Sequence, residues 1–220
     1  MKEKIISVIN QKGGVGKTTT VINLAAGLSQ NNKKILVIDL DPQGNATTGL
    51  GLLNISQSSN SIYEVLSGSK KIDDVISKTK FSNLDIITSN VDLSGLEVET
   101  ADDGRRAYIL KEKLAAYLND SRGHYDYVLI DCPPSLSLLT VMALVASHSL
   151  LVPLQTEFFA LEGITQLIKT IDRIKVGLNP NLEIRGILLT MFDKRNKLSS
   201  EVELEARNSV SYTHLRAHET

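Results

Sequence analysis

The residues best suited to chemistry form a glycine-rich segment close to the N-terminus. It lies between a short apolar run and a segment of helical periodicity, and it contains Gly13, Gly14, Gly16, Lys17 and Thr18. Glycines let the backbone approach phosphate oxygens and turn its N–H groups toward them, and the start of a helix adds a favourable dipole. Strand, glycine-rich loop and helix is the context that a phosphate cradle requires, so the spacing predicts one here.

Individual positions in this loop have distinct expected roles. Lys17 is expected to neutralise charge on the β- and γ-phosphates of a nucleotide, and the Thr18 hydroxyl to ligate Mg²⁺. Val15 and Thr19 complete the predicted cofactor-binding set. The general pattern G-x-x-x-x-G-K-[ST] would require glycine where Gln11 stands, so the segment departs from it. The alternative to a phosphate-binding loop is a glycine-rich turn with solvated lysines and no ligand.

Three aspartates stand where predicted strands end. Asp39 and Asp41 follow the apolar run at 35–38, and Asp131 follows the run at 127–130. Parallel sheets bind ligands at the carboxyl ends of their strands, so these acids are expected near the phosphate loop. Asp131, after four apolar or aromatic residues, is typical of a Walker B aspartate that contacts Mg²⁺. For Asp39 and Asp41 the alternative is a strand-end turn with an Asx cap.

Apolar runs and helical segments alternate along the chain. Buried strands are predicted, because polar alternation is missing, at 5–9, 35–38, 84–87, 127–130, 149–153 and 184–190. Helical spacing recurs at 18–30, 106–119, 138–146, 161–177 and 198–208. This order predicts an α/β fold: a doubly wound, mostly parallel sheet with helices on both faces. The less periodic stretch 52–103 is interpreted as an elaborated crossover in which 62–66 and 72–76 could be short helices.

Composition bounds the remaining possibilities. With 220 residues, 42% of them hydrophobic, one domain over 1–208 is expected, followed by an unstructured or non-native tail at 209–220. The 24 basic and 25 acidic residues nearly balance, so nucleic-acid binding would need a local patch. Cys132 is the single cysteine, which excludes a disulfide framework and favours a buried structural thiol in a reducing cytoplasm. No apolar run reaches the roughly 18 residues of a membrane span.

Taken together, these motifs resemble the ParA/Soj family of chromosome and plasmid partition ATPases. The form K-G-G-x-G-K-T is similar to the deviant Walker A motif, and the resemblance extends through Pro133-Pro134-Ser135 and the segments 157–163 and 188–193, covering 4 to about 208. The same P-loop NTPase fold is implied. The family normally continues with another strand and a closing helix, so this chain is expected to be a C-terminally truncated member.

The resemblance implies roles for particular residues. Lys12 corresponds to the signature lysine that reaches the nucleotide of a partner subunit, and Asp41 to the switch residue that positions the attacking water. Asp39 is expected nearer the Mg²⁺ shell. With Lys12, Lys17 and Asp41 as catalytic residues, the implied activity is slow, Mg²⁺-dependent ATP hydrolysis in an ATP-dependent homodimer.

Family membership also implies partners. The dimer is expected to bind double-stranded DNA non-specifically, with Arg195 as a contact residue, and to be stimulated by a ParB-type centromere-binding protein. Phosphate contacts would make DNA binding strongly salt-dependent. The implied location is the cytoplasm, on the nucleoid and not on a membrane. A solvated loop is the alternative for Arg195.

Two other functions within the superfamily stay open. A MinD-like membrane-associated division ATPase shares the loop but would need a C-terminal amphipathic helix, for which no basic pattern is visible. A metabolic ATP-dependent synthetase would carry a small-molecule pocket beside the phosphate loop, and 52–103 could supply one.

Overall fold

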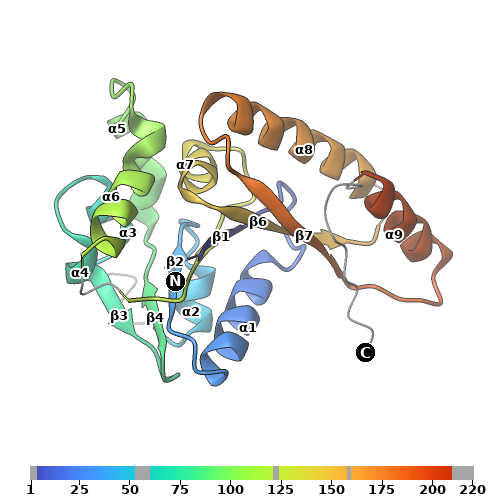
Figure 1. The fold of residues 1–220 in the computed structure, drawn as a ribbon, viewed down its shortest axis with the longest axis horizontal. Helices are drawn as coiled ribbons and strands as arrows, with labels where there is room; N and C mark the ends of the chain where they lie inside the picture. Colours follow the sequence, from blue (N-terminus) through green and yellow to red (C-terminus); the bar gives the residue numbers. More distant parts are fainter. Residues whose placement is uncertain (1–3, 53–59, 121–123, 158–159, 210–220) are drawn as a thin grey trace.

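The β-branched runs of the sequence form the strands of one mixed sheet. The computed structural model describes residues 4–52, 60–120, 124–157 and 160–209 (Figure 1). Seven strands lie in the order β3-β4-β2-β5-β1-β6-β7. They are β1 (Lys4–Val8), β2 (Ile35–Asp39), β3 (Ile76–Lys78), β4 (Leu84–Ile87), β5 (Tyr127–Asp131), β6 (Ser149–Gln155) and β7 (Glu183–Thr190). All pairings are parallel except that of β3 with β4, so the predicted doubly wound, mostly parallel sheet is confirmed.

The edge strand β3 was not expected. The segment 72–76, interpreted as a short helix, is a helix only over α4 (Ile72–Val75), and the chain becomes extended at Ile76. The three residues of β3 then pair antiparallel with β4, in the register Ile76↔Ile87 and Lys78↔Asp85. Three residues are too few for a strand periodicity, so only the pairing itself defines this element.

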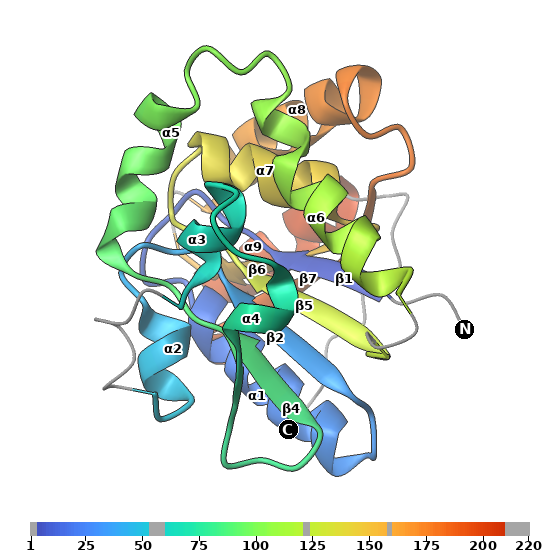
Figure 2. The ribbon, with the colours of Figure 1, turned by 90° about the vertical axis from the view of Figure 1, so that its left-hand side faces the viewer.

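Helices cover both faces of the sheet (Figures 1 and 2). One face carries α1 (Lys17–Gln30) and α2 (Asn45–Gly49), and α1 packs its buried Val21 and Ala25 against β2 and β4. The opposite face carries α3 (Ile62–Leu66), α4, α6 (Ile109–Leu118), α7 (Leu138–Ala146) and α8 (Ala160–Gly177). The last helix, α9 (Lys197–Ser209), contacts α8. The shorter elements are η1 (Val91–Gly95), α5 (Leu96–Glu99) and η2 (Arg106–Tyr108).

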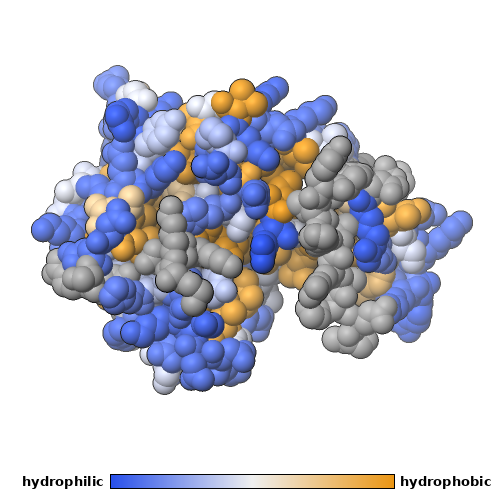
Figure 3. All heavy atoms as spheres, in the orientation of Figure 1, coloured by the Kyte–Doolittle hydropathy of each residue, from blue (hydrophilic) through white to orange (hydrophobic). Residues whose placement is uncertain are grey.

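The middle of the sheet is sealed on both sides. Every residue of β2 and of β4 is buried, as the lack of polar alternation in their sequences predicted. This rigid centre fixes the carboxyl ends of β1, β2, β4 and β5 side by side. On the outside, hydrophilic side chains cover most of the face in Figure 3, with hydrophobic atoms in separate spots. Within the described residues, no helix is long and apolar enough to cross a membrane.

Candidate nucleotide-binding site

The predicted phosphate loop connects β1 directly to α1. Its backbone enters the left-handed region at Gly14 (φ 76°) and again at Gly16 (φ 90°), where side chains are disfavoured. Gly16 also occupies the N-cap of α1, which has no side-chain cap. The first N–H groups of this 14-residue helix therefore face the loop without a capping side chain, as in anion-binding helix starts.

Two polar side chains outside the glycine motif shape the loop. Asn10 donates from Nδ2 to the Pro153 carbonyl at 2.7 Å and accepts from the Lys12 N–H at 2.9 Å. From the far edge of the sheet, the Thr190 hydroxyl donates to the Val15 carbonyl at 2.9 Å. Neither role was predicted. Thr190 lies 175 positions away in the chain, and no local pattern reveals such a contact.

Lys17 is buried at the base of the loop. Only 7% of the residue is exposed, and its ammonium donates to the Lys12 carbonyl at 2.9 Å. Burial lowers the pKa of Lys17, while the negative charges of Asp131 and Asp41 act in the opposite direction. The structure thus brings Lys17 together with two of the predicted acids. A desolvated ammonium at a helix start is suited to an anionic ligand.

Asp131 ends β5 as a buried carboxylate beside the Thr18 hydroxyl and the Lys17 ammonium. The residue is fully buried, and neither carboxylate oxygen has a hydrogen bond of good geometry. Burial, with the charges of Asp39 and Asp41, raises the pKa of Asp131 to about 7, although the nearby Thr18 hydroxyl and Lys17 favour the charged form. An orphaned buried carboxylate is costly. A cation is the ligand that would remove that cost.

Asp39 lies beside Asp131, because the two residues are in register on the neighbouring strands β2 and β5. Its carboxylate is not orphaned: one oxygen accepts from the Thr47 N–H at 2.8 Å and from the Thr47 hydroxyl at 2.7 Å. Burial raises the pKa of Asp39 to about 6 against these hydrogen bonds. Asp41 is 7% exposed, and its N–H donates to Asp39 at 3.3 Å. Both acids therefore lie at the same edge as the loop.

Unsatisfied polar atoms gather at this edge. Among the described residues, each buried side-chain nitrogen or oxygen without a hydrogen bond lies at or after the carboxyl end of a strand. These atoms are Gln11 Nε2, Ser89 Oγ, Asn90 Oδ1, both oxygens of Asp131, Ser137 Oγ, and Glu157 Oε1, whose contact with Lys12 is an ion pair. Buried polar groups are normally paired, so this clustering indicates an edge built for a polar ligand.

The donor set fits Mg²⁺ held jointly with phosphates. No group of three or more His, Cys, Asp or Glu side chains within the described part of the chain could hold a metal alone. Mg²⁺ keeps several waters and is usually bound by one or two carboxylates together with substrate phosphates. Asp131, with the adjacent Thr18 hydroxyl, supplies that kind of partial shell.

The side chains of two predicted residues form ion pairs with acids that were not predicted as site residues. Lys12 is half exposed and forms an ion pair with Glu157 of the same chain. Arg195 lies on the exposed connection between β7 and α9, where its guanidinium donates to both carboxylate oxygens of Asp193 at 3.0 and 2.9 Å. Their roles toward a second subunit and toward DNA stay predictions.

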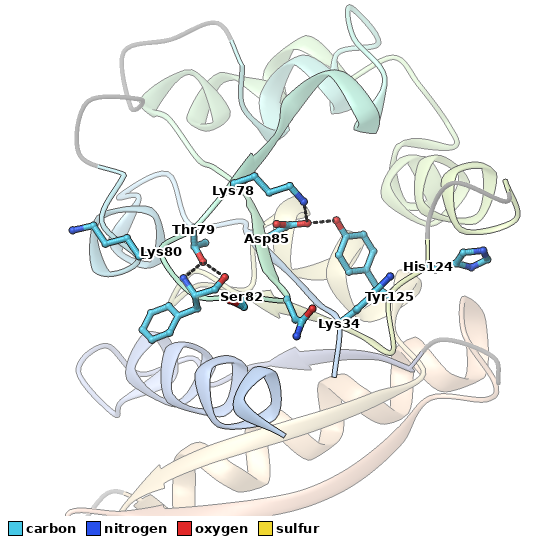
Figure 4. A pocket seen from close by; sticks show the side chains of 10 residues that line it. Lys34, Lys78, Thr79, Lys80, Ser82, Asp85, His124 and Tyr125 are labelled. Atoms are coloured by element: carbon cyan, nitrogen blue, oxygen red, sulfur yellow. Dashed lines mark hydrogen bonds and ion pairs between the residues drawn. The ribbon is translucent and has the colours of Figure 1, made fainter. Parts of the chain in front are cut away.

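A separate cavity opens at the opposite, amino edge of the sheet (Figure 4). It measures about 490 Å³ and is lined by residues that include Lys34, Lys78, Asp85 and Tyr125. Asp85 is satisfied there, because Lys78 Nζ and the Tyr125 hydroxyl donate to it at 2.8 and 2.7 Å. Figure 4 shows Lys78 and Tyr125 turned toward this carboxylate. The cavity lies at the opposite end of the strands from the glycine loop.

Known proteins resemble the chain over most of its length. An AAA domain family model matches residues 3–184. The chromosome partitioning protein ParA of Caulobacter vibrioides is 50% identical over 204 residues, which are 93% of this chain and 75% of that protein. The sporulation initiation inhibitor protein Soj of Bacillus subtilis is 45% identical over 93% of this chain and 79% of its own length. The chain belongs to the ParA/Soj family.

A solved structure extends the comparison to bound ligands. A Mycobacterium smegmatis protein described as cobyrinic acid a,c-diamide synthase, with a bound ATP analogue and magnesium, has a TM-score of 0.86 and 38% identity. The match covers 94% of this chain and 82% of that one. Both comparisons therefore agree with the glycine loop and the strand-end aspartates described above: the relatives share the ParA/Soj sequence, and the solved structure shares the P-loop NTPase fold.

Proposed function

We infer that the chain binds Mg²⁺ and ATP at the carboxyl edge of its sheet and hydrolyses ATP slowly, as a partition ATPase. The observation that carries this proposal is the orphaned, fully buried Asp131 beside Lys17 at the base of a glycine loop. A cation would stabilise the buried carboxylate, and an anion would stabilise the desolvated ammonium. Mg²⁺ and the phosphates of ATP meet both requirements at once.

The residues divide the work between binding and positioning. The backbone of Gly13, Gly14, Val15 and Gly16, with the start of α1 at Lys17, holds the phosphates. Thr18 and Asp131 hold Mg²⁺, directly or through water, with Asp39 behind them. When bound, the metal neutralises charge between the β- and γ-phosphates.

The chemical step is in-line attack of water on the γ-phosphorus, which breaks its bond to the bridging oxygen of the β-phosphate and releases ADP, inorganic phosphate and a proton. Asp41 orients that water. The hydrogen bond from the Asp41 N–H to the Asp39 carboxylate holds Asp41 at the edge of the site. Lys17 neutralises the charge that develops on the phosphoryl oxygens. Lys12 adds a second positive charge from a partner subunit after its ion pair with Glu157 opens.

Partition function adds three further proposals. ATP joins two copies of the chain into a dimer, the dimer binds double-stranded DNA non-specifically through surface residues that include Arg195, and a ParB-type protein accelerates hydrolysis. The name of the Caulobacter relative, chromosome partitioning protein ParA, supports the partition role. The nucleoid in the cytoplasm is the corresponding location.

The direct test is phosphate release from Mg-ATP, with and without duplex DNA and a ParB-type protein, at low and at high salt. A partition ATPase shows slow basal turnover that DNA and the partner raise together, with an effect that fades as salt increases. Asp41→Ala should lose turnover and keep ATP binding. Turnover that does not change when duplex DNA and the ParB-type protein are added would contradict the partition role. Unchanged turnover of Asp41→Ala would contradict the role of Asp41.

A metabolic synthetase is the second candidate, since the Mycobacterium smegmatis structure carries such a description at 38% identity. An amide-forming synthetase couples ATP cleavage to a carboxylate and an amine donor. Phosphate release that requires cobyrinic acid and an amine donor, and does not change when DNA is added, would favour it. Membrane association of the MinD-like kind has no comparable observation in its support.

A further inference from the structure

The loop that carries Asp41 is anchored by a residue outside every recognised motif. Thr47, on helix α2, is 1% exposed. Its N–H and its hydroxyl both donate to the same carboxylate oxygen of Asp39, at 2.8 and 2.7 Å. The side chain is therefore committed to a buried charge, which is among the stronger hydrogen-bond arrangements in proteins.

The same hydroxyl also joins α2 to the end of strand β4. Thr47 Oγ1 accepts from the Ser89 N–H at 3.1 Å, so its donor and an acceptor site are both in use. Next to this contact the loop lies close to β4: a Cβ built on Gly44 would lie 3.7 Å from the Ser89 carbonyl oxygen. Thr47 thus ties together the carboxyl ends of β2 and β4.

The position of Asp41 depends on this anchor. Its N–H donates to the other oxygen of Asp39 at 3.3 Å, and its own carboxylate accepts from the Gln43 N–H at 3.0 Å. Its carbonyl accepts from the Gly44 N–H at 2.9 Å. A continuous chain of hydrogen bonds therefore runs from Ser89 through Thr47 and Asp39 to Asp41.

We propose that Thr47 is a positioning residue for ATP hydrolysis, which holds Asp39 and the loop of residues 41–46 so that Asp41 meets the attacking water. This inference rests on the proposed hydrolytic function. It also gives Asp39 a defined task as the anchor of the loop. Thr47 acts through Asp39 and the loop backbone, so its contribution is to geometry and not to the chemistry itself.

Loss of the hydroxyl leaves two groups poorly satisfied. Asp39 would keep only one donor on that oxygen, Ser89 N–H would lose its acceptor, and an apolar replacement would lie against a buried carboxylate. The loop would then be free to shift. Displacement of a reacting group by about 1 Å can reduce turnover by as much as a hundredfold.

The test compares Thr47→Val, Thr47→Ser and the control Thr48→Val in the full 220-residue chain. Thr48 is the next residue of the same helix, but it is exposed. Turnover at saturating Mg-ATP is measured by phosphate release, and affinity by binding of a fluorescent ATP analogue. We expect Thr47→Val to lower kcat at least about tenfold with little change in affinity, and Thr47→Ser and Thr48→Val to stay near wild type.

Each result bears on one proposal. A wild-type chain that binds ATP without turnover contradicts the hydrolytic function itself. If Thr47→Val keeps wild-type turnover, or if Thr47→Ser loses as much turnover as Thr47→Val, the role of Thr47 is overturned and the hydrolytic function still stands. Should urea unfolding show that Thr47→Val does not fold, Thr47→Cys replaces it. Its weak S–H donor should reduce kcat below that of Thr47→Ser, and equal kcat values for these two variants overturn the inference.

Discussion

Asp131 and Asp85 are buried carboxylates on two strands of one sheet, and their surroundings are opposite. Asp85, near the amino end of β4, receives hydrogen bonds from Lys78 and Tyr125. Asp131, at the carboxyl end of β5, receives none of good geometry. A satisfied acid contributes to stability, whereas an orphaned one costs stability and is kept for a ligand. The buried carboxylate without a hydrogen bond of good geometry thus lies at the edge of the sheet that carries the glycine loop.

The largest effect is expected from Asp131→Asn. The substitution keeps the shape of the side chain but removes the charge that would hold Mg²⁺, so we expect Mg²⁺-dependent phosphate release to fall by at least about a hundredfold. Single-turnover assays over a range of Mg²⁺ concentrations measure this. Turnover within about threefold of wild type would remove Asp131 from the metal site.

Asp85→Asn should show the reverse pattern. It weakens two hydrogen bonds to a charged group, so we expect the free energy of unfolding to fall by about 1–3 kcal/mol. Urea unfolding measures the loss. Phosphate release per folded molecule should stay near wild type, since Asp85 lies at the opposite edge of the sheet. A specific loss of turnover in the folded variant would show that the two edges are coupled.

The pH dependence of stability gives a second test of Asp131. The pKa of Asp131 is raised from 3.8 to about 7, so between these values the folded chain holds a proton that the unfolded chain has released. Stability from this group is therefore lost as pH rises from about 4 to about 7. Asp39, raised to about 6, acts in the same direction.

Asp131→Asn removes this penalty. Without nucleotide, its free energy of unfolding relative to wild type should rise by on the order of 1–2 kcal/mol between pH 5 and pH 8. Urea unfolding of both proteins at the two pH values measures the difference. A difference that is constant with pH would show that the Asp131 carboxylate is already satisfied in the free protein.

The sequence was sufficient for the features that depend on local patterns. Short β-branched runs without polar alternation located six strands, and the glycine spacing located the loop between β1 and α1, because each signal is contained in a short segment. The strand-end position of Asp39, Asp41 and Asp131 then predicted one shared edge, because parallel strands align their carboxyl ends.

Features that depend on long-range pairing could not be found in this way. Strand β3 exists through its pairing with β4, and Thr190 supports the phosphate loop from β7. Thr47 looks like any threonine after a turn until the fold brings Ser89 against it. The contrast between Asp85 and Asp131 is of the same kind, because only the fold decides whether donors from other parts of the chain reach a carboxylate.

The smallest effect is expected from Tyr125→Phe at the amino edge. The Tyr125 hydroxyl is one of two donors to Asp85, and burial together with this hydrogen bond raises its pKa, so it stays protonated and donates. Its loss should cost about 1 kcal/mol of unfolding free energy, with phosphate release unchanged. In an Asp85→Asn background the same substitution should cost less, because its charged acceptor is already gone. Equal costs in the two backgrounds, measured by urea unfolding as a double-mutant cycle, would mean that Asp85 is not stabilised by Tyr125, and the contrast with Asp131 would then rest on Lys78 alone.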